Sequence, residues 1–249
     1  MRPSSLLRTF LTLIICAALV HPAYAGPKRI YSPYVEEGEL ELEYYGTAAV
    51  DDDSDVDGEN AHKVAVGYGV NNFWFTELVG EVEQSGESGA DSEWTAIEWE
   101  NRFQLTEPGQ YWLDAGLYAA YEHSLETDHA DKLEAKILLE KDFGKFSHMA
   151  NISFEQEIGE YSEDHLEMEL AWSSRYRYQP WLEPGFEIYS ELGRADNMES
   201  FDEQEHLAGP VIYGDFAQHF HYELGYLFGI SDASPDGEAR WLIEYGVPF

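Results

Sequence analysis

The sequence predicts an all-β fold: a single-chain, antiparallel, up-and-down transmembrane β-barrel of about twelve strands, with a cleaved signal peptide. Three observations predict it. Apolar and polar residues alternate along most of the chain, in segments long enough to cross a bilayer when tilted, for which about 9–11 residues suffice. Short connections alternate with longer acidic ones between these segments, as in barrels that have short turns at one end and long loops at the other. The final segment, residues 238–249, has an aromatic-rich face and ends on Phe249.

Residues 1–25 have the pattern of a secretory signal peptide. Two arginines precede an apolar run over residues 10–20, and Ala23-Tyr24-Ala25 forms an A-x-A cleavage site before Gly26. The apolar run is shorter than the roughly 18 residues that a transmembrane helix needs. The only cysteine, Cys16, lies in this leader behind Ile15, where a lipidation site has a small residue. We therefore expect export, without lipidation and without disulfides.

Residues 26–36 contain two prolines and no alternation, which predicts a short periplasmic N-terminal segment. Residues 37–249 then form the predicted barrel domain. Its expected strands cover residues 37–48, 62–70, 73–84, 93–105, 111–124, 132–143, 146–158, 165–178, 182–192, 206–213, 220–230 and 238–249.

In each of these segments one parity is apolar and the other is polar or small, because successive side chains of a strand point to opposite faces. Residues 133–139 illustrate this, since Leu133, Ile137 and Leu139 alternate with Glu134 and Lys136. Residues 206–213 are the weakest segment, because Pro210 cannot donate a ladder hydrogen bond. If that hairpin does not span the membrane, the barrel has ten strands.

Aromatic residues gather beside the short connections. Phe143 and Phe146 flank the turn at Gly144, and Tyr176 and Tyr178 precede another. Such a grouping predicts an aromatic girdle at the periplasmic interface. A secreted soluble β-sandwich predicts no such grouping.

The chain is strongly acidic. Its formal net charge is −35, and loss of the two leader arginines makes this −37 (−35 minus 2). This charge argues against nucleic acid and anionic membrane surfaces as partners. Aromatic residues nevertheless make up 15% of the chain, so we expect two segregated faces and not a disordered chain.

The last strand resembles the C-terminal signal strand of Gram-negative outer-membrane β-barrel proteins. The residues that carry the resemblance share one parity and are Trp241, Ile243, Tyr245, Val247 and Phe249. The resemblance implies an outer-membrane location, insertion by the barrel assembly machinery, closure against the first strand, and contact with outer-membrane lipid and lipopolysaccharide. Residues 31–45 also look like the opening of uncharacterised proteobacterial barrels that are grouped with transporters.

Carboxylates and a few cations share the inward parity of nearly every expected strand. These candidate lumen residues are Glu39, Glu41, Glu43, Glu77, Glu81, Glu98, Glu100, Arg102, Glu122, Glu134, Lys136, Glu155, Glu167, Glu169, Arg175, Arg177, Glu187, Glu191, Glu223, Arg240 and Glu244. Rings of charge set the selectivity of a pore, so an open lumen would prefer cations. The same residues could instead form an ion-pair network that fills a narrow barrel.

Metal-binding patterns are weak. Asp53, Asp55, Asp57 and Gly58 match the first half of an EF-hand loop, but Val64 stands where the closing acid belongs. We interpret residues 50–61 as a solvated acidic loop, and whether it binds divalent cations stays open. His219 and His221 share a parity but have no third ligand in sequence. We expect no metal centre and no cofactor.

An enzyme is the less favoured alternative. Ser124 beside His123, and Ser174 and Ser190 on the outer parity, could belong to a lipid-directed hydrolase, but no nucleophile motif surrounds them. The favoured interpretation is a porin-like outer-membrane channel for small solutes, with an acidic lumen that prefers cations, and not an enzyme. The alternatives are a non-conducting envelope barrel with acidic binding loops, or a barrel enzyme that modifies lipid or lipopolysaccharide.

Overall fold

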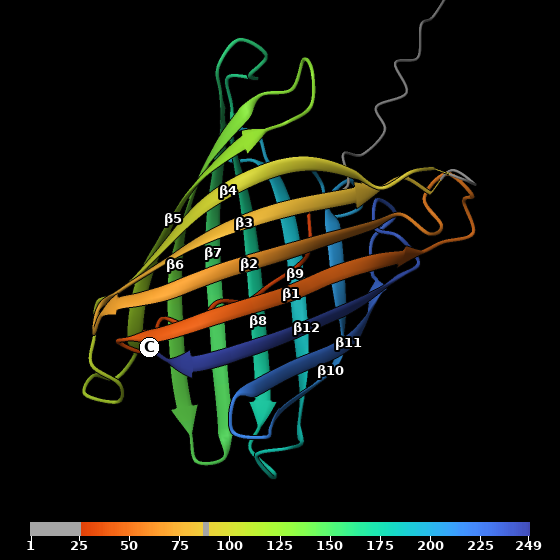
Figure 1. The fold of residues 1–249 in the computed structure, drawn as a ribbon. Coiled ribbons are helices and arrows are strands. Elements are labelled where there is room, and N and C mark those ends of the chain that lie inside the picture. Colours follow the sequence, from red (N-terminus) through yellow and green to blue (C-terminus); the bar gives the residue numbers. More distant parts are fainter. Residues whose placement is uncertain (1–25, 87–89) are drawn as a thin grey trace, which may run out of the picture.

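The structure is a computed structural model that describes residues 26–86 and 90–249. The described chain forms twelve strands: β1 (Glu39–Val50), β2 (Asn60–Asn71), β3 (Trp74–Gln84), β4 (Glu93–Gln104), β5 (Asp114–Ser124), β6 (Asp131–Phe143), β7 (Phe146–Ile158), β8 (Leu166–Tyr176), β9 (Glu183–Arg194), β10 (Glu205–Phe216), β11 (Phe220–Gly229) and β12 (Gly237–Pro248). Each strand pairs with its neighbour in sequence, and β1 pairs antiparallel with β12 to close the barrel (Figure 1). The predicted fold class and strand number are confirmed.

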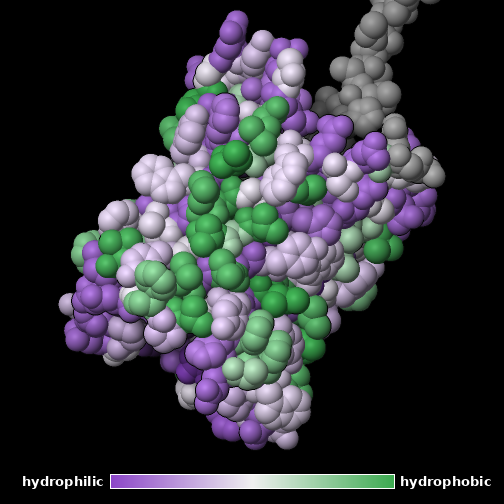
Figure 2. Space-filling model, in the orientation of Figure 1, coloured by the Kyte–Doolittle hydropathy of each residue, from purple (hydrophilic) through white to green (hydrophobic). Residues whose placement is uncertain are grey.

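Alternation along each strand separates two faces. On β6, Leu133 and Ile137 point outward and are 45% and 39% exposed, whereas the inward Leu138 is fully buried. On the face that Figure 2 shows, hydrophobic side chains gather in the middle of the barrel and hydrophilic ones toward its ends. An outer face of this kind is what a membrane barrel presents to lipid. No helix among the described residues is long and apolar enough to cross a bilayer.

The two ends of the barrel differ. Strands β2 and β3, or β6 and β7, join through two-residue turns at what we call the short-turn end. The other end carries the longer acidic connections and is called the long-loop end. Aromatic side chains pack against one another at the short-turn end. The ring centroids of Phe146 and Tyr176 are 5.1 Å apart, and those of Phe220 and Tyr245 are 4.7 Å apart. The predicted grouping of aromatics is therefore present.

Strand β10 is longer than the sequence pattern indicated. It runs over Glu205–Phe216 and pairs with β9 without interruption, including at Pro210. The ladder to β11 skips Gly209 and Pro210 and resumes at Val211. Proline thus costs hydrogen bonds on one side only, and the ten-strand alternative is wrong.

Residues 26–36 are the main departure from expectation. They were predicted to be a periplasmic segment outside the barrel, but they lie inside it, and we call them the luminal segment (Figure 1). Gly26 lies beside Glu81, toward the long-loop end, and the segment leaves at the short-turn end, where the Gly38 amide donates to the Gly69 carbonyl. The predicted signal peptide, residues 1–25, lies outside the described residues.

Candidate functional site: an acidic lumen with an internal segment

Two cations hold the luminal segment to the barrel wall. The Lys28 ammonium pairs with Glu191 on β9 and lies 3.1 Å from Glu205 on β10, and only 4% of its side chain is exposed. The Arg29 guanidinium makes a two-point contact with Glu43 on β1 and lies over the ring of Tyr45. The segment therefore brings positive charge to a wall that has an excess of carboxylates.

Polar groups hold the rest of the luminal segment. Tyr31 exchanges two hydrogen bonds with the Asn151 side chain on β7, one through its amide at 2.7 Å and one through its carbonyl at 2.9 Å. Further along, the Ser32 hydroxyl donates to Glu140 at 2.7 Å and the Tyr34 hydroxyl donates to Asp114 at 2.8 Å. Because a buried backbone group needs a partner, the Asn151 side chain does for Tyr31 what a neighbouring strand would do.

Small inward residues make room for the segment. A Cβ added to Gly69 would lie 1.8 Å from the Glu36 carbonyl oxygen, and one added to Gly116 would lie 2.9 Å from Pro33. Glycine thus lets backbone approach backbone at these points.

Apolar packing fills the middle of the barrel. Ile30 joins a buried cluster with side chains from β7 to β11, and Tyr31 joins a second one with Tyr118, Ala120 and Leu138. The members that Ile30 joins are Met149, Ala171, Tyr189, Leu207, Val211, Tyr213 and Leu227. The luminal segment and the wall therefore form one packed core at this level.

A second charged cluster lies among strands β9 to β12. Both oxygens of Glu187 accept hydrogen bonds from Arg240 Nη1, at 2.8 and 2.7 Å, and Arg240 Nη2 donates to Glu223 at 2.5 Å. The hydroxyls of Tyr213 and Tyr189 also donate to Glu187. This part of the lumen is a filled ion-pair network, as one of the two sequence alternatives required.

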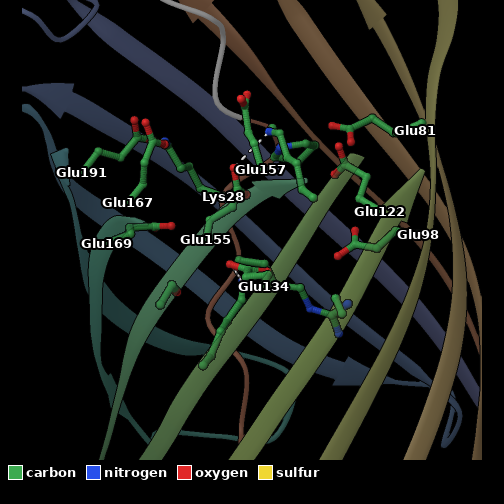
Figure 3. Close-up of a pocket in the computed structure, with 18 of the residues that line it drawn as sticks. Lys28, Glu81, Glu98, Glu122, Glu134, Glu155, Glu157, Glu167, Glu169 and Glu191 are labelled. Carbon is green, nitrogen blue, oxygen red and sulfur yellow. Dashed lines mark hydrogen bonds and ion pairs between the residues drawn. The ribbon is translucent and has the colours of Figure 1, made fainter. Parts of the chain in front are cut away.

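Above the packed middle, a cavity of about 710 Å³ opens between the long loops (Figure 3). Its rim includes Glu126 and His129 from the β5–β6 loop and Glu199 and Glu203 from the β9–β10 loop. Fourteen glutamates line it, against four lysines and one arginine. We call this cavity the vestibule. Figure 3 shows carboxylates converging on it from opposite walls, with Lys28 between them.

The rim carboxylate of Glu203 has a specific environment. The Ser200 hydroxyl donates to it at 2.8 Å and the Ser200 amide at 3.1 Å. These hydrogen bonds stabilise the charged form and lower the pKa of Glu203 below its usual value.

Twenty of the predicted lumen residues lie within strands, and Arg177 lies just beyond the end of β8. Nine of them line the vestibule: Glu81, Glu98, Glu122, Glu134, Lys136, Glu155, Glu167, Glu169 and Glu191. The others lie outside the vestibule lining: Glu39, Glu41, Glu43, Glu77, Glu100, Arg102, Arg175, Arg177, Glu187, Glu223, Arg240 and Glu244. Among the latter, Arg177 pairs with Asp142 at 2.7 Å in a largely exposed position.

Sequence reasoning missed some inward residues. Glu83, Glu157 and Lys132 line the vestibule and share the parity of their strands, so the same pattern could have found them. Lys28 and Arg29 were missed for another reason, because their segment has no alternation that could assign it to a wall.

At the β1–β2 loop, carboxylate oxygens of Asp51, Asp52 and Asp236 lie within 4.8 Å of one another, a group that does not include the predicted Asp53, Asp55 and Asp57. In the β1–β2 loop, Asp51 and Asp53 accept hydrogen bonds from backbone amides of their own loop. His221 contacts Asp215 at 2.7 Å, whereas His219 bonds to the Gly246 carbonyl, so the two histidines have separate partners.

The serine and histidine candidates have separate partners as well. His123 bonds to Asp131 at 2.8 Å, and the adjacent Ser124 hydroxyl accepts from the Glu126 amide. Ser174 lies opposite His148, whose ring stacks on Phe146 and Trp172. Ser190 lies opposite His206, which bonds to Gln204.

The final strand has the geometry that its resemblance implies. Strand β12 pairs with β1 from Gly237 to Pro248, and Ile243 and Phe249 are 45% and 88% exposed. Recognition of Trp241, Ile243, Tyr245, Val247 and Phe249 by the assembly machinery stays a prediction.

Comparisons with known proteins give likeness in structure alone. No protein-family model matches the chain, and no curated protein matches it in sequence. An outer membrane channel from Pseudomonas putida has a TM-score of 0.61 at 10% identity, over 92% of this chain and all of that one. The NanC porin has a TM-score of 0.55 at 9% identity, over 84% of this chain and 99% of that one. The chain therefore has the fold of outer-membrane β-barrel channels.

Proposed function

We propose that this protein is an outer-membrane channel for small solutes whose acidic vestibule favours cations. The observation that carries the proposal is the vestibule, in which fourteen glutamates outnumber five lysine and arginine side chains. A ring of like charge in a water-filled lumen concentrates counter-ions and sets selectivity. The fold shared with a porin and a channel supports the same function.

The luminal segment limits what passes. Ile30 and Tyr31 pack with the wall in the middle of the barrel, below the vestibule. In this proposal the long-loop end collects cations, and the packed middle restricts flow to small solutes. The contacts with outer-membrane lipid, lipopolysaccharide and the assembly machinery belong to the proposal too.

The test is the reversal potential of single channels in a planar bilayer under a KCl gradient. We expect a cation-selective conductance. Neutralising three partly exposed vestibule carboxylates, in the triple variant Glu122→Gln, Glu157→Gln and Glu167→Gln, should move the reversal potential toward zero.

A matched control removes three carboxylates outside the vestibule lining: Asp91→Asn, Glu107→Gln and Glu160→Gln. It should leave the reversal potential unchanged. An anion-selective wild type, or equal shifts in both triple variants, would contradict the proposal.

The packed middle favours one second candidate, a barrel that does not conduct and whose acidic loops bind a partner. The same recording separates the two, because this candidate gives inserted protein with no conductance.

A further inference from the structure

A buried carboxylate oxygen faces the first residue of the luminal segment. Glu81 on β3 is 6% exposed and points into the vestibule (Figure 3). Its Oε2 lies 3.4 Å from Lys63 Nζ, but its Oε1 has no hydrogen-bond partner among residues 26–86 and 90–249. A Cβ built on Gly26 would lie 2.7 Å from that Oε1. The free oxygen is thus directed at Gly26.

A buried polar atom without a partner destabilises the fold, and a charged group does so more than a neutral one. Lys63 cannot compensate fully, because it also pairs with Glu98 at 2.9 Å. A positive charge or a hydrogen-bond donor at Gly26 would satisfy this oxygen.

The sequence supplies one at that position. Gly26 directly follows the A-x-A pattern of Ala23-Tyr24-Ala25, so cleavage there would turn the Gly26 nitrogen from a peptide amide into an α-ammonium. An α-amino group is mostly protonated at pH 7. Hydrogen bonds between an ammonium and a carboxylate are about twice as strong as neutral ones.

We propose that Glu81 is a binding site for the protein's own mature N-terminus: the α-ammonium of Gly26, created by leader removal, pairs with Glu81 and fixes the free end of the luminal segment to β3. The segment is then held by three cations, the terminal ammonium, Lys28 and Arg29. Leader removal and attachment of the luminal segment are coupled in this way, because an uncleaved or blocked chain lacks the terminal ammonium.

Zero-length cross-linking tests the pairing directly. Wild-type protein exported and processed in membranes, with Gly26 verified as its first residue by mass, is treated with a carbodiimide and mapped by mass spectrometry. We expect an amide between the Gly26 nitrogen and the Glu81 carboxyl, formed with loss of one water. The Lys28–Glu191 pair serves as an internal positive control.

Two variants sharpen the test. Glu81→Gln should remove the Gly26 cross-link and keep the one at Lys28. Glu83→Gln, which removes the same charge two residues along the same wall, should keep both. The rate at which an acylating reagent modifies the Gly26 amine at pH 7 should rise about tenfold in Glu81→Gln and stay unchanged in Glu83→Gln. A tenfold change corresponds to a difference of about one unit in the pKa of the amine.

A Gly26 cross-link to a different carboxylate in wild-type protein would overturn the inference, as would an amine that reacts as fast as that of a free peptide. Neither result depends on conductance. The outcome is therefore independent of whether the barrel is a channel.

Discussion

Replacing Arg240 by methionine should strongly destabilise the barrel. Arg240 is 3% exposed and is the only lysine or arginine, among the residues that the structure describes, within ion-pair distance of Glu187. It also pairs with Glu223. Methionine fills a similar volume but leaves two carboxylates in the lumen without that cation.

The magnitude follows from burial. The side chains of Arg240 and Glu187 are 2% and 1% exposed, so water cannot replace the lost partner. Removing one member of such a buried pair costs about 3–5 kcal/mol. Tyr213 and Tyr189 still donate to Glu187, but two neutral donors do not balance a charge.

The assay is guanidinium unfolding of the protein folded in lipid vesicles, followed by tryptophan fluorescence, with the free energy of unfolding obtained by linear extrapolation. Arg177→Met is the matched control, because its pair with Asp142 is 39% and 45% exposed and should contribute at most about 1 kcal/mol. Adding Glu187→Gln to Arg240→Met should recover part of the loss, since contacting residues couple by about 0.5–3 kcal/mol. An Arg240→Met variant no less stable than Arg177→Met would show that the buried Arg240–Glu187 pair does not stabilise the barrel.

Three other perturbations test separate parts of the account. Ile137→Arg puts a charge at the middle of the lipid face of β6 and should cost about 2–4 kcal/mol in the same unfolding assay; no loss would mean that this face does not meet lipid. Ser200→Ala should raise the pKa of Glu203 toward its usual range in a carboxyl NMR titration, because the hydroxyl contributes the larger of two downward effects; an unchanged pKa would mean that the hydroxyl does not contribute. Gly69→Ala would place a Cβ against the Glu36 carbonyl, so the luminal segment should become more accessible to protease; unchanged digestion would contradict the close approach.

The barrel could be predicted from the sequence because the pattern that specifies each strand is visible within a few consecutive residues. Lipid outside and polar groups inside impose a two-residue period on every strand, and Leu133, Glu134 and Ile137 show it within five residues. Strand ends were less accurate, since they depend on pairing. Strand β1 starts at Glu39 and continues to Val50, beyond the predicted residue 48, because β12 offers partners as far as Gly237.

The luminal segment could not be located in the same way. Residues 26–36 have no periodicity, and their partners Asn151 and Glu140 lie more than 100 positions away in the sequence. One signal was present, since Lys28 and Arg29 are close together in a chain with few cations and many inward carboxylates. Charge complementarity of that kind favours an internal position but does not specify one.

The most direct test of the account compares single-channel conductance with and without the luminal segment, in wild-type protein and in a variant lacking residues 26–36. The account predicts a larger conductance after deletion, with cation preference retained because the vestibule wall keeps its glutamates. The double variant Lys28→Gln and Arg29→Gln, which keeps the chain length, should shift conductance in the same direction. Equal conductance in all three proteins would contradict the proposal that a charged internal segment restricts flow through an acidic channel.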